Sequence, residues 1–199
     1  MNAALDQFRE NHQRAQELVQ LTHAIDELTT EAIDLEDLLR AALVLGVSAL
    51  DHFVHEYVLC EMLEVHKGHR QATDPYLRFS VPLAAAHEGM NDLGGDDWLA
   101  NAIRASHSFL AFQQPDKIAD AIRLISNVPL WQEVGNHLGR SAADIKTELK
   151  IIVDRRNKIA HEADMDPTYP GTRWQIDEQL TMRSLGFVVD VAEAIAAVT

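Results

Sequence analysis

The sequence of 199 residues predicts an all-α protein. Apolar residues recur at intervals of three and four through most of the chain, which is the period of an amphipathic helix. Polar caps, glycines and prolines separate these segments, and we find no convincing strand pattern, internal repeat or low-complexity tract. Because 47% of the residues are hydrophobic, the chain can bury a sizeable core, and we interpret residues 1–199 as one domain.

Two long helices are predicted in the first third of the chain. The first, within an acidic segment of residues 1–30, covers about residues 3–29, and its expected apolar stripe is Leu18, Leu21, Ile25 and Leu28. The second covers about residues 35–67, with Asp34 as N-cap and Gly68 as its end. Its expected buried side consists of Leu38, Leu39, Ala42, Leu45, Ala49, Phe53, Tyr57, Cys60 and Leu63.

Residues 68–138 resemble an insertion made of short helices and loops. Two prolines and the lack of a sustained period predict an ordered excursion over residues 68–82. Short helices are expected at about residues 83–90, 98–113, 116–126 and 130–138, with a break at residues 91–95. In the last of these helices, Trp131 is expected to anchor the packing.

Two further helices are predicted within residues 140–199. Ser141 with Asp144 resembles a capping box and opens a helix of about residues 142–162. After two proline turns, a last helix begins at Asp177 and ends near residue 197. Their expected core residues are Ile145, Leu149, Ile152 and Ile159 in the first, and Leu180, Leu185, Phe187, Val188, Val191 and Ile195 in the second.

The charge is strongly acidic overall but not uniform. A formal net charge of −14 argues against indiscriminate nucleic-acid binding, because polyanions are repelled by acidic surfaces, and we expect no DNA partner. Residues 1–39 hold nine acidic and two basic side chains, whereas residues 140–161 hold three acidic and six basic ones. The second segment is therefore a basic island in an acidic protein.

Cysteine usage and the N-terminus favour a cytoplasmic protein. Cys60 is the one cysteine, so an intramolecular disulfide is excluded, and its apolar neighbours predict that it is buried. The N-terminus lacks a basic leader and an apolar core, and we find no run of about 18 apolar residues that would span a membrane.

The most specific chemical pattern is the end of the helix at residues 142–162, which reads Asp154-Arg155-Arg156-Asn157-Lys158-Ile159-Ala160-His161-Glu162. Arginine binds phosphate and histidine moves protons near neutral pH, which are the two functions that metal-free RNA cleavage needs. A step of five residues leaves Arg156 and His161 about 140° apart on a helix, whereas Asn157 is about 40° from His161. Arg156 must therefore reach around the helix, and a site between two such helices is favoured over a site on one.

The segment from Arg156 to His161 resembles the arginine–histidine signature of the HEPN superfamily. Its continuation through Asp166-Pro167, Pro170-Gly171 and Arg173-Trp174, together with residues 48–56, is similar to the RiboL-PSP-HEPN branch. The resemblance implies a helical bundle with long antiparallel helices that forms a homodimer, with the motif helices facing each other across a composite cleft. Many members are metal-independent endoribonucleases of toxin, defence or RNA-processing systems.

In that interpretation, His161 acts as proton donor or acceptor, and Arg156 holds the scissile phosphate. Asn157 orients the imidazole or contacts phosphate, and Arg155 and Lys158 are further candidates for substrate binding. The expected product carries a 2′,3′-cyclic phosphate, without a metal or another cofactor. RNA is then the substrate, and an antitoxin or a regulatory protein is a candidate partner.

Two other interpretations of the motif stay open. The family also contains noncatalytic modules that bind a nucleotide, an RNA or a protein, and the net acidity favours this alternative. Basic residues and a histidine in the last turn of a helix are also ordinary partners of the helix dipole.

Polar residues outside the motif offer weaker candidates. Asp51, His52, His55 and Glu56 lie on the second long helix, where they could face the motif cleft, form a polar surface or, less favourably, bind a metal. Trp174 could stack on a base, but packing against the last helix is favoured.

Overall fold

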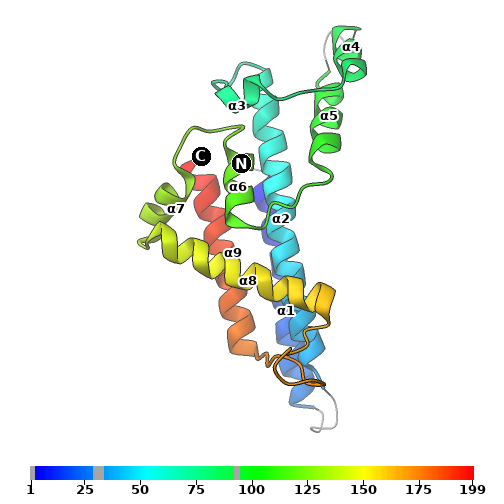
Figure 1. The fold of residues 1–199 in the computed structure, drawn as a ribbon, viewed down its shortest axis with the longest axis vertical. Coiled ribbons are helices and arrows are strands. Elements are labelled where there is room, and N and C mark those ends of the chain that lie inside the picture. The colour runs from blue at the N-terminus through cyan, green and yellow to red at the C-terminus, as the bar shows by residue number, and fades with distance from the viewer. Residues whose placement is uncertain (1–2, 29–33, 92–94) are drawn as a thin grey trace.

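The computed structural model describes residues 3–28, 34–91 and 95–199, and these residues form helices and no strand. Three long helices, α1 (Ala3–Asp26), α2 (Glu36–His66) and α9 (Glu178–Val198), pack along the long axis of the molecule, and α8 (Ala142–Glu162) crosses them (Figure 1). α1 runs antiparallel to α2, to which it is packed. The prediction of an all-α fold with long antiparallel helices is confirmed.

The shorter helices are α3 (Asp74–Leu77), α4 (Leu83–Asn91), α5 (Asp97–His107), α6 (Pro115–Ile122) and α7 (Leu130–Leu138). The predicted helix at 98–113 ends early, because the segment after His107 leaves the helix and its Phe112 amide binds the Asp51 carboxylate on α2. The helix predicted at 116–126 also ends early, at Ile122, where tight turns follow. Of the break expected at 91–95, residues 92–94 lie outside the described residues, as does residue 29 at the expected end of the first helix.

Side-chain caps begin α8 and α9 where the sequence predicts them. Ser141 Oγ accepts the amide of Asp144 at 3.1 Å, and Asp177 Oδ1 accepts the amide of Leu180 at 2.7 Å. The N-cap predicted for α2 is displaced by one residue, because Leu35 takes that position without a side-chain bond, while Asp34 Oδ1 accepts the amide of Glu36 at 2.9 Å. Each bond satisfies a donor that the first turn of a helix otherwise leaves free. Side-chain caps therefore mark the starts of α8 and α9, whereas α2 begins without one.

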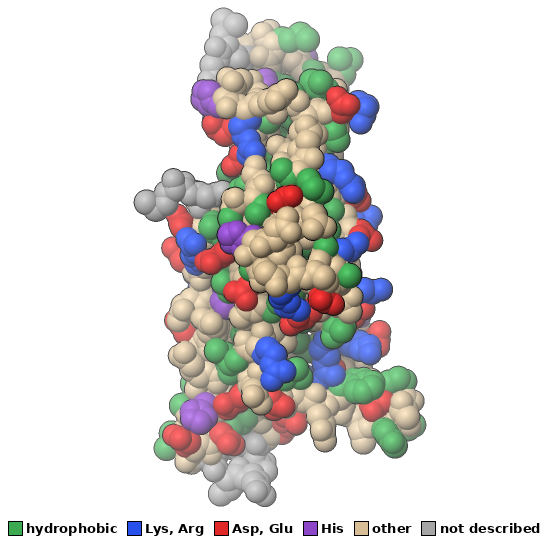
Figure 2. Space-filling model, turned by 90° about the vertical axis from the view of Figure 1, so that its left-hand side faces the viewer, with side chains coloured by type: hydrophobic (Ala, Val, Ile, Leu, Met, Phe, Trp, Pro, Cys, Tyr) green, Lys and Arg blue, Asp and Glu red, His purple; other side chains and the backbone are tan. Residues whose placement is uncertain are grey.

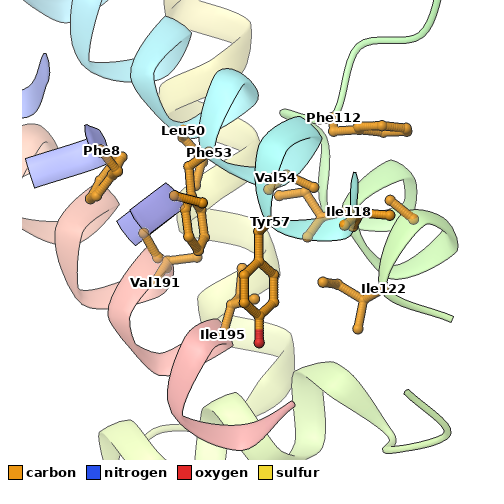
Figure 3. Packing of buried hydrophobic residues seen from close by; sticks show 14 of the residues in the cluster. Phe8, Leu50, Phe53, Val54, Tyr57, Phe112, Ile118, Ile122, Val191 and Ile195 are labelled. Atoms are coloured by element: carbon orange, nitrogen blue, oxygen red, sulfur yellow. The ribbon is translucent and has the colours of Figure 1, made fainter. Parts of the chain in front are cut away.

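The main core lies between α2, α9 and the helices packed on them (Figure 3). The ring centroids of Phe8 and Phe53 are 5.5 Å apart, and those of Phe53 and Tyr57 are 5.4 Å apart. Trp131 is 8% exposed and donates from Nε1 to the Pro115 carbonyl oxygen at 3.0 Å, as expected of a packing anchor. The core therefore joins both ends of the chain to α2.

The stripe predicted for α1 is only partly correct, because Leu18 packs against a smaller core cluster but two other members are exposed. Leu21 and Leu28 are 48% and 85% exposed. The buried side of α1 consists of Ala4, Phe8, His12, Ala15, Val19 and Thr22. Both sets follow helical spacing, and the small residues of the second set let α1 lie close to α2 and α9.

Three apolar residues predicted to be buried on the other long helices are exposed: Leu45 and Leu180 at 44% each, and Cys60. α2 has more apolar positions than one face can hold, and five helices pack on it: α1, α5, α6, α8 and α9. Spacing alone therefore could not identify which of its apolar residues stay at the surface.

By length and composition alone, α2 could cross a membrane, because its 31 residues include an 18-residue stretch with a mean hydropathy of 1.3. Other helices bury 56% of that stretch, which is typical of the central helix of a bundle.

Candidate functional site

Arg156 lies where α8 crosses α2. Its half-buried guanidinium donates from Nη1 to Asn157 Oδ1 at 3.1 Å, and Nη2 lies 3.5 Å from Ser48 Oγ on α2. Its buried Nε has no hydrogen-bond partner among the described residues. Within those residues no carboxylate pairs with Arg156 either, so its guanidinium contacts only neutral hydrogen-bond partners and its charge is not neutralised.

Asn157 and His161 lie on one edge of α8, one helical turn apart. Asn157 is half-buried, whereas the His161 side chain is exposed. Across residues 3–28, 34–91 and 95–199, no protein group hydrogen-bonds to the imidazole of His161. The Arg156 guanidinium therefore lies between Ser48 on α2 and Asn157, the residue that shares an edge of α8 with His161.

Arg155 has a different environment. Its Nη2 donates to Asp164 Oδ2 at 2.8 Å and to the carbonyl oxygens of Trp174 and Gln175 at 3.0 and 3.1 Å. Burial lowers the pKa of Arg155, and the charge of Asp164 opposes this effect. Because its carboxylate partner is already in place, Arg155 is less available to another anion than Arg156.

A buried ion pair ties the loop after α8 to α2. Asp164 is fully buried, and its Oδ2 also accepts Arg40 Nε at 2.8 Å. Arg40 further donates to Glu36 and to the Trp174 carbonyl oxygen. α8 ends in two left-handed residues, Ala163 with φ 51° and Asp164 with φ 58°, and this turn brings the carboxylate inward. The pairing of Arg40 with Asp164 was not predicted from the sequence, although a charged Arg40 on the apolar side of α2 was a usable signal.

Lys158 and Trp174 form a second contact between α8 and that loop. The Lys158 ammonium lies 5.0 Å from the centroid of the Trp174 ring, which is within the range of a cation–π interaction. The indole Nε1 of Trp174 is buried and has no partner among the described residues. The structure therefore places Lys158 against Trp174, beside the motif.

The polar residues of α2 beyond Ser48 mostly contact the segment that follows α5. Asp51 accepts the Phe112 amide, and the His55 ring centroid is 4.4 Å from that of Phe112. Glu56 lies 3.5 Å from Arg104, and His52 is exposed. Asp51, His55 and Glu56 thus hold α5 and its following segment. In the described part of the chain, no three metal-ligating side chains converge.

A family model for RiboL-PSP-HEPN domains matches residues 9–198 of this sequence. No curated protein and no solved structure matches it significantly. The match extends from α1 to the end of α9 and includes the motif helix with Arg156, Asn157 and His161. Because the match covers nearly the whole chain, this protein belongs to the RiboL-PSP-HEPN family.

Proposed function

We propose that the protein is a metal-independent endoribonuclease whose active site forms between the motif helices of a homodimer. One observation carries this proposal: Arg156 has no carboxylate partner among the described residues and extends towards the edge of α8 that carries the exposed His161. An arginine without a carboxylate partner and an exposed histidine on the same helix are suited to binding a phosphate and moving a proton.

The reaction needs a base and an acid on opposite sides of the phosphorus. A neutral His161 takes the proton of the ribose 2′-hydroxyl, whose oxygen attacks the adjacent phosphorus. A protonated His161 of the partner subunit gives its proton to the leaving 5′-oxygen. Arg156 binds the phosphate oxygens and stabilises the negative charge that develops on them. The products are a 2′,3′-cyclic phosphate and a free 5′-hydroxyl.

Exposed apolar residues support an interface beside the motif. Ile151 on α8 is 63% exposed, and Leu180 on α9 is 44% exposed. Both line a depression of about 230 Å³ that also includes Arg155 and Ile176. Covering these side chains with a second copy would remove apolar area from water.

The position of the acidic residues that follow the motif also supports catalysis. A motif neutralised by Glu162 and Asp164 would favour a noncatalytic module. Asp164 instead turns inward to Arg40 and Arg155, and Glu162 is exposed. Neither forms an ion pair with Arg156 among the described residues.

Cleavage of a single-stranded RNA in EDTA tests the proposal directly. We expect the wild type to cut the RNA and to leave 2′,3′-cyclic phosphate ends, and we expect His161→Ala and Arg156→Ala to lose at least about 100-fold in rate. His137→Ala is a matched control, because His137 is exposed in the last turn of α7 as His161 is in α8. Arg183→Ala on α9 is the control for the arginine. Equal cleavage by the wild type and both motif variants would contradict the proposal.

The dimer needs its own measurement. Light scattering at micromolar concentration is expected to give twice the chain mass of 22.3 kDa. A strictly monomeric mass would remove the composite site, even if cleavage were observed.

A noncatalytic module that binds RNA, a nucleotide or a protein is the second candidate, and the net charge of −14 favours it. RNA binding without cleavage, abolished by Arg156→Ala and unaffected by His161→Ala, would support the module over the enzyme.

A further inference from the structure

A groove with a basic lining lies beside α8, on the N-terminal side of the motif. It has a volume of about 520 Å³ and is formed by the first turn of α6 and the first half of α8. Its charged side chains are Lys117, Lys146, Lys150 and Asp116, which leaves an excess of two positive charges. Basic side chains, mixed with acidic ones, gather along the right-hand edge of Figure 2. This edge corresponds to the front of the molecule in Figure 1, where α8 lies.

Two of the three lysines are not neutralised within the described residues. Lys146 lies 3.1 Å from Asp116, an ion pair with side chains that are 42% and 85% exposed. Lys117 and Lys150 are exposed and form no ion pair there. An exposed pair such as Lys146–Asp116 is weak and exchanges easily with another anion.

The groove and the motif share one edge of α8. At about 100° per residue, Lys150, Asn157 and His161 lie about 40°, 20° and 60° from Lys146 around the helix axis. Lys150 is about 10 Å from Asn157 and about 16 Å from His161 along that axis. A stacked strand rises about 3.4 Å per nucleotide, so this separation corresponds to about three to five nucleotides.

The start of α6, which forms the wall of the groove opposite α8, is held in place by contacts with residues outside the groove. Gln114 Nε2 donates to Asp154 Oδ1 on α8 at 3.0 Å, between the groove and the motif. The Pro115 carbonyl oxygen accepts the indole N–H of the buried Trp131. The first turn of α6 is thereby attached to both α8 and α7. These contacts hold Lys117 on α6 opposite Lys146 and Lys150 on α8.

We propose that this groove binds the phosphate backbone of the RNA strand, a few nucleotides away from the phosphate held at Arg156. The inference rests on the proposed function, because an RNA strand passes along α8 only if its scissile phosphate binds at the motif. Lysines on flexible stems bind phosphates as point charges and without base selectivity. The groove therefore adds affinity for longer strands and leaves the chemistry at His161 unchanged.

Binding can be measured without cleavage, so that failure of this inference is distinguishable from failure of the enzyme proposal. The probe is a fluorescein-labelled single-stranded RNA of about 12 nucleotides, bound in EDTA to the full-length His161→Ala protein. The test variant adds Lys117→Gln and Lys150→Gln. The matched control adds Arg78→Gln and Arg183→Gln, which remove the same charge at two exposed arginines that form no ion pair among the described residues.

We expect the two lysine substitutions to weaken binding about ten-fold and to reduce the slope of log K against log salt by about 1.4, which corresponds to two phosphate contacts. The arginine control should keep the slope and affinity of the His161→Ala protein. Equal affinity and slope in the lysine variant, or no RNA binding by the His161→Ala protein, would overturn the inference. If the lysine variant weakens binding and the wild type does not cleave RNA, the groove stands and the enzyme proposal fails.

Substrate length supplies a second readout in a cleaving protein. For the long RNA, kcat/KM should fall about ten-fold with Lys117→Gln/Lys150→Gln, mainly through KM. For a dinucleotide, whose single phosphate occupies the motif, kcat/KM should not change. An equal loss for both substrates would point to damage at the motif and would contradict the groove.

Discussion

Arg156 Nη1 donates to Asn157 Oδ1, the side chain of the next residue in α8, across 3.1 Å. Consecutive side chains of a helix diverge by about 100°, so a helix does not create this contact by itself. The arginine must bend around α8 to make it. The bond therefore orients the guanidinium towards the side that carries His161.

Asn157 is expected to act by positioning Arg156. Asn157→Ala should lower kcat by about ten-fold or more, because a hydrogen bond to a charged group contributes about 1.5–3 kcal/mol. Asn157→Asp keeps the acceptor but brings a negative charge close to the phosphate, so it should raise KM. Steady-state cleavage of RNA in EDTA measures both, with Asn136→Ala on α7 as the control. Wild-type kcat in Asn157→Ala would show that the contact has no catalytic role.

Asp164 is expected to stabilise the fold. Asp164→Ala leaves Arg40 and Arg155 without their shared carboxylate, and breaking a buried ion pair costs about 3–5 kcal/mol of unfolding free energy. Asp164→Asn should cost less, because an amide oxygen still accepts hydrogen bonds and asparagine tolerates the left-handed backbone. Urea denaturation gives these values, and the exposed Asp190→Ala should stay within about 0.5 kcal/mol of the wild type. A similarly small effect of Asp164→Ala would mean that the ion pair does not contribute to stability.

Gly46 is expected to be required for the contact between α2 and α9. A Cβ at this position would lie 2.2 Å from Leu185 Cδ2, so Gly46→Ala should destabilise the fold by about 1–3 kcal/mol. Gly186, the neighbour of Leu185 on α9, has no atom within 4 Å of such a Cβ. Gly186→Ala should therefore stabilise α9 by about 0.5–1 kcal/mol. Melting temperatures of both variants test the opposite signs, and a loss of stability in both would contradict the packing argument.

His12 is expected to make the fold sensitive to acid. Burial lowers the pKa of His12, and the hydrogen bond to the Leu185 carbonyl oxygen only partly offsets this effect. The unfolded chain therefore binds the proton more tightly than the folded one. Stability is full above about pH 6.5, the ordinary pKa of histidine, and decreases as the pH falls towards the lowered pKa of the folded state.

His12→Gln tests this contribution, because glutamine can still donate a hydrogen bond and does not titrate. Its melting temperature should fall less between pH 7.5 and pH 5 than that of the wild type. The exposed His137→Gln should keep the wild-type dependence. An unchanged acid response in His12→Gln would place the sensitivity elsewhere.

The helix boundaries were predictable where their signals are local. Ser141 and Asp177 cap α8 and α9 through side-chain bonds to an amide three residues later, and Gly68 follows α2 with a φ of 78°. The end of α5 was not predictable, because Phe112 leaves the helical register to bind Asp51 on a distant helix. The buried side of α1 also required the structure, since Phe8 and Leu21 belong to two apolar sets that satisfy the same spacing.

The sequence by itself determined the all-α class and the candidate motif, because helical geometry fixes the angles between Arg156, Asn157 and His161. Only the tertiary structure decided which arginine remains available. Asp164 turns inward through a left-handed turn and meets Arg40, which lies 124 residues away along the chain. The shared carboxylate binds Arg155 and leaves Arg156 with neutral partners among the described residues. Residue spacing alone could not predict which arginine pairs with Asp164, because the pairing depends on how α2, α8 and the following loop pack together.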